Sequence, residues 1–585
     1  MNRRSFLQNA VIASIAGQIP DLKSQTTAPN KRLTKKALSG LNAHYELSLD
    51  RVLRGQNPTY TPELLLADIS ASGGRRFTNF SGDLSGRYVG ALSTVAQHRS
   101  LQLPGFDDLV ATMISRQHPE GYFGASFNFE DPKDEDLALL WGNGRLLIGL
   151  LEYQQYRPTA AVLASATKLG NFLLQIGPLM NSDTMRNRFN ADHYATSYIC
   201  WTQTLESVIA LYRATHDPAY LKLGREIAAH IEYRPGEHAH GFLASVRGIG
   251  DLYQLTQETQ YLATMESIWH RIFNSENMLV TGGVPERWVP EKRRTEGCAI
   301  ADWIRLSLTL WGITKKEPYI VAAENAIFNE FQLNHFAEGD FGHRVLNETG
   351  VDGSNSVRSW WCCTLHGLRC FPDIVQSAFR IDKESIFYDL PVSSSCEQRQ
   401  LAISAVSTLE DDAKVRLHVD RTNANSAISV HIRKPIWAES IAITYNGSET
   451  KAEERDGYLI VKGQWKAGDE IEIHYVMRLR CEGKLTNNQF ALIYGPWLLG
   501  ADKLDSESYF NEETANNVLK MDGTHLPHAS EQPSSNIFRV PTAHFSVEYQ
   551  QAEYPMQPGT TVLRPVSEQA GLPSTDWQFL FTKNV

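Results

Sequence analysis

The sequence is poor in cysteine, has no long apolar run beyond its N-terminus, and carries no strong excess of one charge. Seven cysteines in 585 residues are too few, and odd in number, for a disulfide framework to support the fold. No segment after the N-terminus is apolar for long enough to cross a bilayer. The net charge of −10 argues against nucleic acid or an anionic membrane as the main partner. These absences leave a globular chain, with residues enough for about three or four domains.

Residues 1–30 have the pattern of an export signal and linker. Residues 2–7 contain paired arginines, as a twin-arginine motif does. An apolar stretch from Ala10 to Gly17 follows, with a small-residue cleavage site near Ala16. We therefore expect export to the periplasm or the cell exterior by the twin-arginine route, which carries proteins that are already folded.

Residues 40 to about 385 are predicted to be helical, within a barrel domain assigned to residues 31–385, and they contain an internal repeat. Each copy begins with Leu followed by an aromatic residue; a Thr comes three residues after the aromatic residue, and a Tyr comes five residues after the Thr. The copies are residues 211–221, 252–262 and 310–320, with a weaker fourth from residue 150. A helix is predicted to end near each Thr, and the next to begin around each Tyr. Repeated helix pairs bury their apolar faces against one another, which favours a closed (α/α)6 barrel; an open solenoid is the alternative.

From residue 386 the apolar residues recur with period two, as in strands. Alternating runs occupy residues 413–419, 427–433, 441–445 and 470–475. Asn446-Gly447 and Asp456-Gly457 are typical of turns between them. We predict an antiparallel β-sandwich over residues 386–495, and a polar linker with a small second β-module over residues 496–585.

Two short segments carry the residues best suited to chemistry. Cys362 and Cys363 are adjacent, and a disulfide between neighbouring cysteines strains the peptide that joins them. Glu296 and Cys298 come just before a predicted helix, whose N-terminus favours both anions. Three thiolates and one carboxylate have the number and type of the ligands of one tetrahedral zinc ion. The alternative is that these cysteines are merely small buried residues, but their combination in a cysteine-poor chain favours a metal site.

These segments belong to a wider pattern. Thr281-Gly-Gly283, Glu296-x-Cys298-Ala299, and Cys362-Cys363 followed by His366-Gly367 resemble the signature of glycoside hydrolase family 127, the β-L-arabinofuranosidases. The likeness extends over roughly residues 40–395. It implies that the helical barrel is the catalytic domain of a zinc-dependent retaining glycosidase. The substrate would be a carbohydrate from which β-L-arabinofuranose or a similar sugar is released.

The resemblance also implies a nucleophile. Cys362 would attack the sugar while zinc holds it together with Glu296, Cys298 and Cys363. A free thiol has a pKa of about 8.5, and a bound metal removes its proton. The thiolate would then replace the carboxylate of an ordinary retaining glycosidase and form a covalent thioglycosyl intermediate.

A general acid and sugar-binding residues complete the expected site. Glu286 is the best match to the family's acid/base glutamate, and Glu291 is a rival because the spacing differs from that of better-known members. His238 matches a family position that touches the sugar. His193 and Tyr194 are further candidates for the lining of the cleft.

Two other functions fit a helical barrel. A polysaccharide lyase or a hydrolase of unsaturated uronides would use His/Tyr or carboxylate pairs and would not need adjacent cysteines. A non-catalytic sugar-binding protein would hold zinc as a structural ion within a closed shell of four ligands.

Overall fold

The computed structural model describes residues 40–71, 79–191, 197–288, 293–382, 385–423, 428–482, 489–502, 518–519, 530–532, 535–544, 557–571 and 576–583. The chain forms two compact units: one is Tyr45–Asp373, and the other combines the described residues 40–44 with the chain from Ile374 onwards. The predicted export signal, residues 1–30, lies outside the described residues. Within the described ranges, every helix is too short or too polar to span a bilayer.

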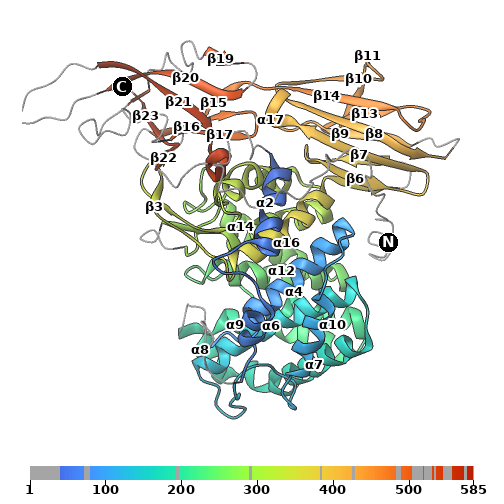
Figure 1. Ribbon diagram of the computed structural model, residues 1–585, viewed down its shortest axis with the longest axis vertical. Coiled ribbons are helices and arrows are strands. Elements are labelled where there is room, and N and C mark those ends of the chain that lie inside the picture. The colour runs from blue at the N-terminus through green and yellow to red at the C-terminus, as the bar shows by residue number, and fades with distance from the viewer. Residues whose placement is uncertain are drawn as a thin grey trace, which may run out of the picture. The chain divides into compact units, whose positions relative to one another are not determined.

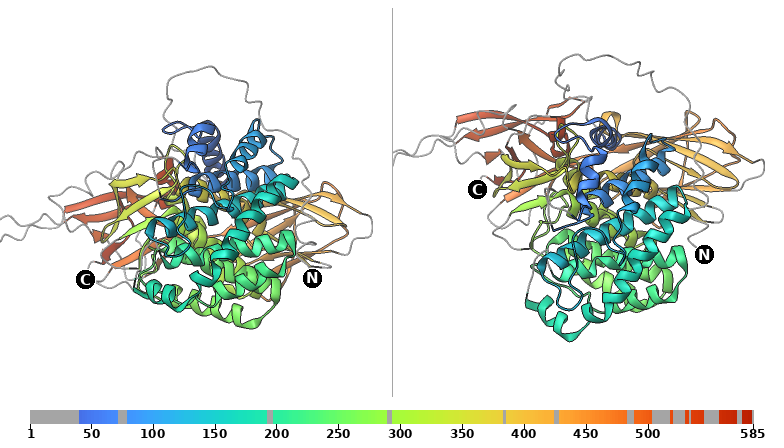
Figure 2. Two further views of the ribbon diagram at one scale, coloured as in Figure 1. Left: turned by 90° about the horizontal axis from the view of Figure 1, so that it is seen from below. Right: turned by 60° about the horizontal axis from the view of Figure 1, so that its bottom comes forward.

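The first unit is an (α/α)6 barrel whose helices are drawn in colours from blue through green to yellow (Figure 1, Figure 2). The inner helices are α4 (Asp83–Arg99), α6 (Asp134–Tyr156), α10 (Thr204–Thr215), α12 (Ala239–Thr256), α14 (Gly297–Thr314) and α16 (Cys363–Ser377). From α4 to α14 these helices pack against one another in chain order. His366 of α16 bonds Asp302 of α14, and α16 lines a small cavity together with α4 and α6. The ring is therefore closed, as predicted, and the open solenoid is wrong.

The outer helices bury only one face. They are α2 (Leu41–Arg54), α5 (Phe106–Ser115), α7 (Ala160–Met180), α11 (Pro218–Ala228), α13 (Thr259–Phe273) and α15 (Glu317–Asn325). In α13 the buried residues Met265, Ile268, Trp269 and Ile272 recur at helical spacing. Trp269 stacks on Trp303 of α14 with ring centroids 5.3 Å apart, which joins the outer layer to the inner one. Shorter helices lie between these elements: α3 (Pro62–Asp68), α8 (Asp183–Ala191), α9 (Tyr198–Thr202) and the π-helix η1 (Ala326–Phe331).

The threonine of the repeat ends one helix and helps to begin the next. Helices α10, α12 and α14 end at Thr215, Thr256 and Thr314, as predicted. Each threonine hydroxyl donates to the carbonyl four residues back, at 2.8–3.0 Å. Each also accepts the backbone N–H two residues ahead, at 3.2–3.3 Å. The residue between adopts a left-handed conformation, with φ of 60° in all three copies, so the chain reverses within a few residues.

Close packing of α4 against α6 requires two glycines. A Cβ added to Gly86 would lie 2.4 Å from the Cα of Leu146. A Cβ added to Gly149 would lie 2.2 Å from the carbonyl oxygen of Gly86. A side chain cannot lie that close to another atom, so only glycine at these two positions allows the two helix backbones to touch. This close packing places the buried Arg87 of α4 inside the barrel.

A three-stranded antiparallel ribbon interrupts the helices of the first unit. Its strands are β1 (Arg294–Glu296), β2 (Gly342–Leu346) and β3 (Gly350–Arg358). The prediction of a helical region up to about residue 385 is wrong for these segments and for the strand β4 (Phe379–Asp382). The sequence of β3 is rich in Gly, Ser and Asn and has no apolar period of two, so pairing with its neighbour determines its conformation.

The second unit contains two sheets that follow the predicted alternation. One has the order β11 (Ser448–Glu449), β10 (Ser440–Tyr445), β14 (Glu470–Val476), β8 (Lys414–Thr422), β7 (Leu401–Thr408) and β6 (Ser394–Glu397). The other has the order β12 (Glu453–Arg455), β13 (Tyr458–Lys462), β9 (Ser429–Arg433), β5 (Ser385–Tyr388) and β4 (Phe379–Asp382). All these pairings are antiparallel except β5 with β9. The turns at Asn446-Gly447 and Asp456-Gly457 have positive φ at both residues, as a two-residue hairpin requires.

A further sheet in this unit follows the sandwich. It includes β15 (Leu479–Glu482), β16 (Gln489–Tyr494), β17 (Trp497–Asp502), β21 (Gln557–Pro565) and β20 (Ser535–His544). Phe490, Leu492, Leu499, Leu563 and Phe581 form its fully buried core. Much of the predicted polar linker lies outside the described residues.

Candidate active site

Two helix N-termini carry the predicted metal ligands. Glu296 ends β1 and is the N-cap of α14, so Cys298 lies in the first turn of that helix. Cys363 begins α16, shortly after the end of β3. Because β1 pairs with β2 and β2 with β3, the ribbon brings together segments that are far apart in the sequence. The positive end of each helix dipole favours the anionic forms of these side chains.

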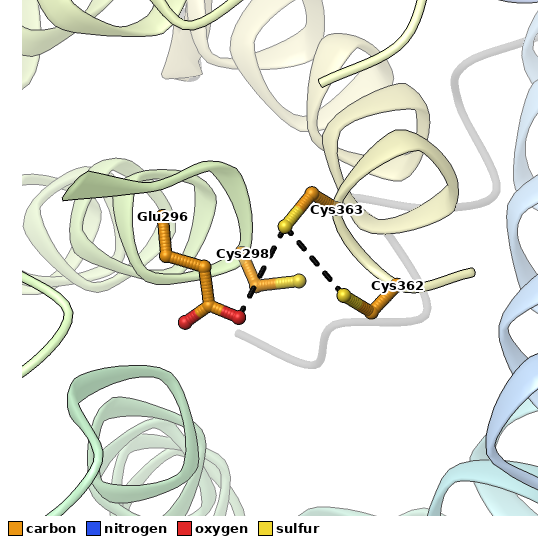
Figure 3. A group of neighbouring side chains, drawn as sticks. All are labelled: Glu296, Cys298, Cys362 and Cys363. Carbon is orange, nitrogen blue, oxygen red and sulfur yellow. Dashed lines mark hydrogen bonds between the residues drawn. The ribbon is translucent and has the colours of Figure 1, made fainter. Parts of the chain in front are cut away.

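Glu296, Cys298, Cys362 and Cys363 form one cluster, called here the sulfur–carboxylate centre (Figure 3). One ligand atom of each residue lies within 4.8 Å of the others. The Sγ atoms of Cys362 and Cys363 are 3.6 Å apart, and Cys363 Sγ lies 4.0 Å from Oε1 of Glu296. The side chains predicted to share one metal ion therefore converge.

The centre is buried, and its members differ in exposure. Cys298 and Cys363 are 0% exposed, Glu296 is 4% exposed and Cys362 is 9% exposed. Cys362 is thus the member of the centre that a molecule from outside can reach most easily.

Without a cation, the three thiols differ in proton affinity. Burial raises the pKa of Cys298 well above its usual range, and its sulfur neighbours raise it further. A hydrogen bond with Cys298 acts to lower the pKa of Cys362, but Cys363, burial and Glu296 together raise it well above its usual range. Burial also acts to raise the pKa of Cys363, but hydrogen bonds with the other two sulfurs lower it to about 6. Two of the three thiols therefore need a cation to ionise at neutral pH.

The sulfur–carboxylate centre fits one zinc ion. Two sulfurs bound at about 2.3 Å to one tetrahedral ion would lie about 3.8 Å apart. The observed separation of the adjacent cysteines is 3.6 Å. Three sulfur donors and one carboxylate, buried together, are a ligand set that zinc accepts and that calcium or magnesium does not.

His238 and Glu286 lie beside Glu296. One ligand atom of each of these three residues lies within 4.8 Å of the other two. His238 Nε2 is 2.9 Å from Oε2 of Glu296, and burial, which lowers the pKa of His238, is outweighed by that carboxylate, which raises it. The backbone N–H of Glu286 donates to Arg294, and that of Ala239 donates to the carbonyl of Glu286, at 2.7 and 2.9 Å. These bonds hold Glu286 between the start of α12 and β1.

Arg294 makes a two-pronged ion pair with Glu286. One guanidinium nitrogen, Nη2, donates to Oε1 of Glu286 at 2.7 Å, and Nε donates to the other carboxylate oxygen. His343 Nδ1 lies 3.7 Å from the same carboxylate. The Arg294 side chain is 43% exposed, so it can leave the pair for solvent at little cost.

His193, Tyr194 and the rival acid Glu291 lie outside the described residues.

A second group of buried charges, not predicted from the sequence, adjoins the centre. Arg87 Nη1 donates to Cys298 Sγ at 3.7 Å, and Arg87 Nη2 donates to Nε2 of His240 at 2.9 Å. The other nitrogen of His240 bonds Asp302 at 2.6 Å. Burial acts to lower the pKa of Arg87, but Asp83 and the sulfurs of Cys298 and Cys362 raise it. Asp302 could have been suspected, because it follows Cys298 by one helical turn; Arg87 and His240 carry no such signal.

Glu330 is a further buried residue that supports the site. It lies in the π-helix, is 0% exposed, and accepts the hydroxyl hydrogen of Thr281. Burial raises the pKa of Glu330 to about 7, although hydrogen bonds with Thr281 and Thr295 act to lower it. Thr281 begins the turn before Glu286, and Thr295 precedes Glu296. The carboxyl group of Glu330 therefore bonds to both of the chain segments that lead into the site.

Glu330 is expected to make stability depend on pH. A carboxyl group with a pKa of about 7 when folded and about 4.5 when unfolded binds more protons in the folded state between these values. The free energy of unfolding should therefore fall by about 3 kcal/mol as the pH rises through this window. Glu330→Gln should remove this loss and be more stable than the wild type at pH 8, measured by urea unfolding. The exposed Glu317→Gln is the control; equal pH dependence in wild type and Glu330→Gln would contradict the assignment.

Sequence comparison identifies two domains. The family model described as "Beta-L-arabinofuranosidase, GH127 catalytic domain" matches residues 51–376, and that of the GH127 middle domain matches residues 386–477. No curated protein matches the chain in sequence.

Several solved structures share the fold. A GH127 β-L-arabinofuranosidase from Geobacillus stearothermophilus T6 is 14% identical, with a TM-score of 0.71 over 92% of this chain and 98% of that one. A second GH127 β-arabinofuranosidase is 14% identical, with a TM-score of 0.69 over 94% of both chains. A third structure, a glycoside hydrolase, is 17% identical, with a TM-score of 0.66 over 89% of this chain and 95% of that one.

Proposed function

This chain belongs to glycoside hydrolase family 127, and from that premise we propose a zinc-dependent retaining glycosidase whose nucleophile is Cys362. Its substrate would be a carbohydrate with terminal β-L-arabinofuranose or a similar sugar. The observation that carries the proposal is the convergence of three sulfurs and one carboxylate within 4.8 Å, with Cys362 the most exposed. A lyase would not need this arrangement.

Glu296, Cys298, Cys362 and Cys363 would hold the zinc ion. When bound, zinc would supply the positive charge that keeps the Cys362 sulfur ionised at neutral pH. The side chains of Glu296 and His238, which lie 2.9 Å apart, would stay paired, so the carboxylate keeps its orientation.

In the first step, the Cys362 sulfur attacks the anomeric carbon. A carbon–sulfur bond forms as the bond to the leaving oxygen breaks, and Glu286 gives its proton to that oxygen. Glu286 must be protonated for this step, so Arg294 has to leave its carboxylate; the exposure of Arg294 allows this release.

In the second step, the carboxylate of Glu286 takes a proton from a water molecule. The oxygen of that water attacks the anomeric carbon, and the carbon–sulfur bond breaks with its electron pair returning to Cys362. Two displacements at one carbon retain its configuration.

A panel of nitrophenyl glycosides tests the proposal. Hydrolysis of a β-L-arabinofuranoside, with arabinose released in the β-configuration in an early NMR spectrum, is the expected outcome. Inversion at the anomeric carbon, or a product with an absorbing C4–C5 double bond, would contradict it. A protein that binds the sugar without turnover would instead be a non-catalytic lectin.

Glu286→Gln should reduce kcat/KM on substrates with poor leaving groups by about 10²- to 10⁴-fold. The loss should be much smaller for dinitrophenyl glycosides, because their leaving group needs no proton. Glu291→Gln is the matched control and should keep its activity. If Glu291→Gln loses activity and Glu286→Gln does not, the acid has been assigned to the wrong residue.

We also propose export by the twin-arginine route. Replacing Arg3 and Arg4 by lysine should leave the protein in the cytoplasm, as measured by fractionation of cells producing the full chain. Replacing the nearby Gln8 and Asn9 by alanine is the control. Undiminished export of the double-lysine variant would rule out this route.

A further inference from the structure

Arg87 donates a hydrogen bond directly to a sulfur of the sulfur–carboxylate centre. Its three guanidinium nitrogens have different partners: Asp83 at 2.7 Å, His240 at 2.9 Å and Cys298 Sγ at 3.7 Å. Arg87 is 5% exposed, so its charge is poorly screened by water. Arg87 already forms an ion pair with the carboxylate of Asp83, so its additional bond to a sulfur atom needs an explanation.

The position of Arg87 is fixed from both sides. Asp83, one turn earlier on α4, also accepts the indole N–H of Trp141 at 2.9 Å. Arginine can only donate, so Nε2 of His240 must accept, and its Nδ1 carries the hydrogen that Asp302 accepts. His240 is therefore neutral and has a single tautomer.

Asp302 connects this arrangement back to the centre. It lies on the same helix as Cys298, four residues later, and its Oδ1 accepts from Arg247 at 2.8 Å and from His366 at 2.9 Å. His366 lies on α16, three residues after Cys363. The two helices that supply the sulfurs are thus joined beneath the centre.

This group is not a second metal site, although His240, Asp302 and His366 offer three ligand atoms within 4.8 Å. Arg87 occupies one nitrogen of His240, and Arg247 donates to Asp302. Two guanidinium groups would repel a metal cation there. The adjoining cavity, of about 10 Å³, has room for one water molecule and not for a sugar.

Resting on the proposed function, we propose that Arg87 is a positioning residue that orients the Cys298 sulfur and offsets surplus negative charge at the centre. Four anionic ligands around one divalent ion leave an excess of two negative charges. Arg87 supplies one positive charge from inside the barrel. By donating to the Cys298 sulfur, it also reduces the electron density which that sulfur gives to the metal.

The test compares Arg87→Met and Arg87→Lys with Arg369→Met in the full chain. Arg369 is also buried and ion-paired, with Glu152 and Glu206, but no bond from it to a sulfur is observed among the described residues. Zn²⁺ affinity is measured by competition with a chelator, and the sulfur-to-metal absorption band is measured after Co²⁺ substitution. Arg87→Met should weaken Zn²⁺ binding by about 10- to 100-fold and move the band to lower energy. Arg87→Lys should recover part of the affinity, and Arg369→Met should change neither quantity.

An unchanged affinity and band in folded Arg87→Met, or an equal loss in Arg369→Met, would overturn the inference. If Arg87→Met does not fold, the Arg87→Lys variant provides the test, because one ammonium nitrogen cannot take the places of the three guanidinium nitrogens that bond Asp83, His240 and Cys298 separately. An unchanged absorption band in Arg87→Lys would then overturn the inference as well. Wild-type protein that binds no Zn²⁺ would overturn the proposed function too. In another outcome, the wild type binds Zn²⁺ and hydrolyses arabinofuranosides while Arg87→Met has the same affinity and absorption band as the wild type. This result would overturn only the role of Arg87.

Discussion

Cys362→Ala is expected to reduce kcat/KM on a nitrophenyl β-L-arabinofuranoside by on the order of 10⁴-fold or more. Alanine has no atom that can form a bond to the anomeric carbon, so the two-step route is lost. Mass spectrometry of the intact wild type with a slowly turned-over fluorinated furanoside should show one added glycosyl group. Cys362→Ala should show none.

Cys370→Ala is the matched control for this variant. Cys370 is also a buried cysteine of α16, but its sulfur faces the carbonyl oxygen of Ala301 at 3.7 Å, outside the sulfur–carboxylate centre. This variant should keep its activity and its glycosyl adduct. Full hydrolysis by metal-loaded Cys362→Ala would show that another group is the nucleophile.

Removal of zinc should abolish activity and destabilise the protein. A ligand bound only by the folded state stabilises it by about 4 kcal/mol when its free concentration is 1,000 times Kd. Dialysis against a chelator should therefore lower Tm, and added Zn²⁺ should restore both Tm and turnover, whereas Mg²⁺ should not. Full activity in protein shown to be free of metal by elemental analysis would refute the zinc dependence.

The affinity of the protein for zinc should also depend on pH, and the sign of this dependence follows from the pKa values of the thiols. In the metal-free protein the pKa of Cys298 and of Cys362 is raised, whereas that of Cys363 is about 6. Between pH 7 and 8, zinc binding should release about two protons, from Cys298 and Cys362, so affinity should fall as the pH falls. Calorimetry in buffers of different ionisation enthalpy measures this number. Release of no proton would mean that the thiols are not ligands.

Much of the barrel could be predicted because its determinants are local. The Thr of each repeat bonds within its own helix and accepts the backbone N–H of the N-cap residue of the next helix, so a pattern of eleven residues defines a helical hairpin wherever it occurs. The strands β2 and β3 could not be predicted in the same way. These two strands pair with each other across a short connection, and β2 also pairs with β1, which is distant in the sequence. The residues of β3 have little preference for a strand, so its conformation depends on this pairing.

The ligand types of the candidate site could be read from the sequence, since adjacent cysteines and a Glu-x-Cys motif have few other uses in a chain so poor in cysteine. The sequence by itself thus determined which atoms could bind a metal and where the repeated helical hairpins lie. Only the tertiary structure decided that Arg87 of α4 and His240 of α12 meet beneath the sulfurs, and that Arg294 pairs with Glu286. The reason is physical: each ligand motif and each helix depend on residues close in the chain, whereas a buried charge is partnered by whichever helices face it across the barrel.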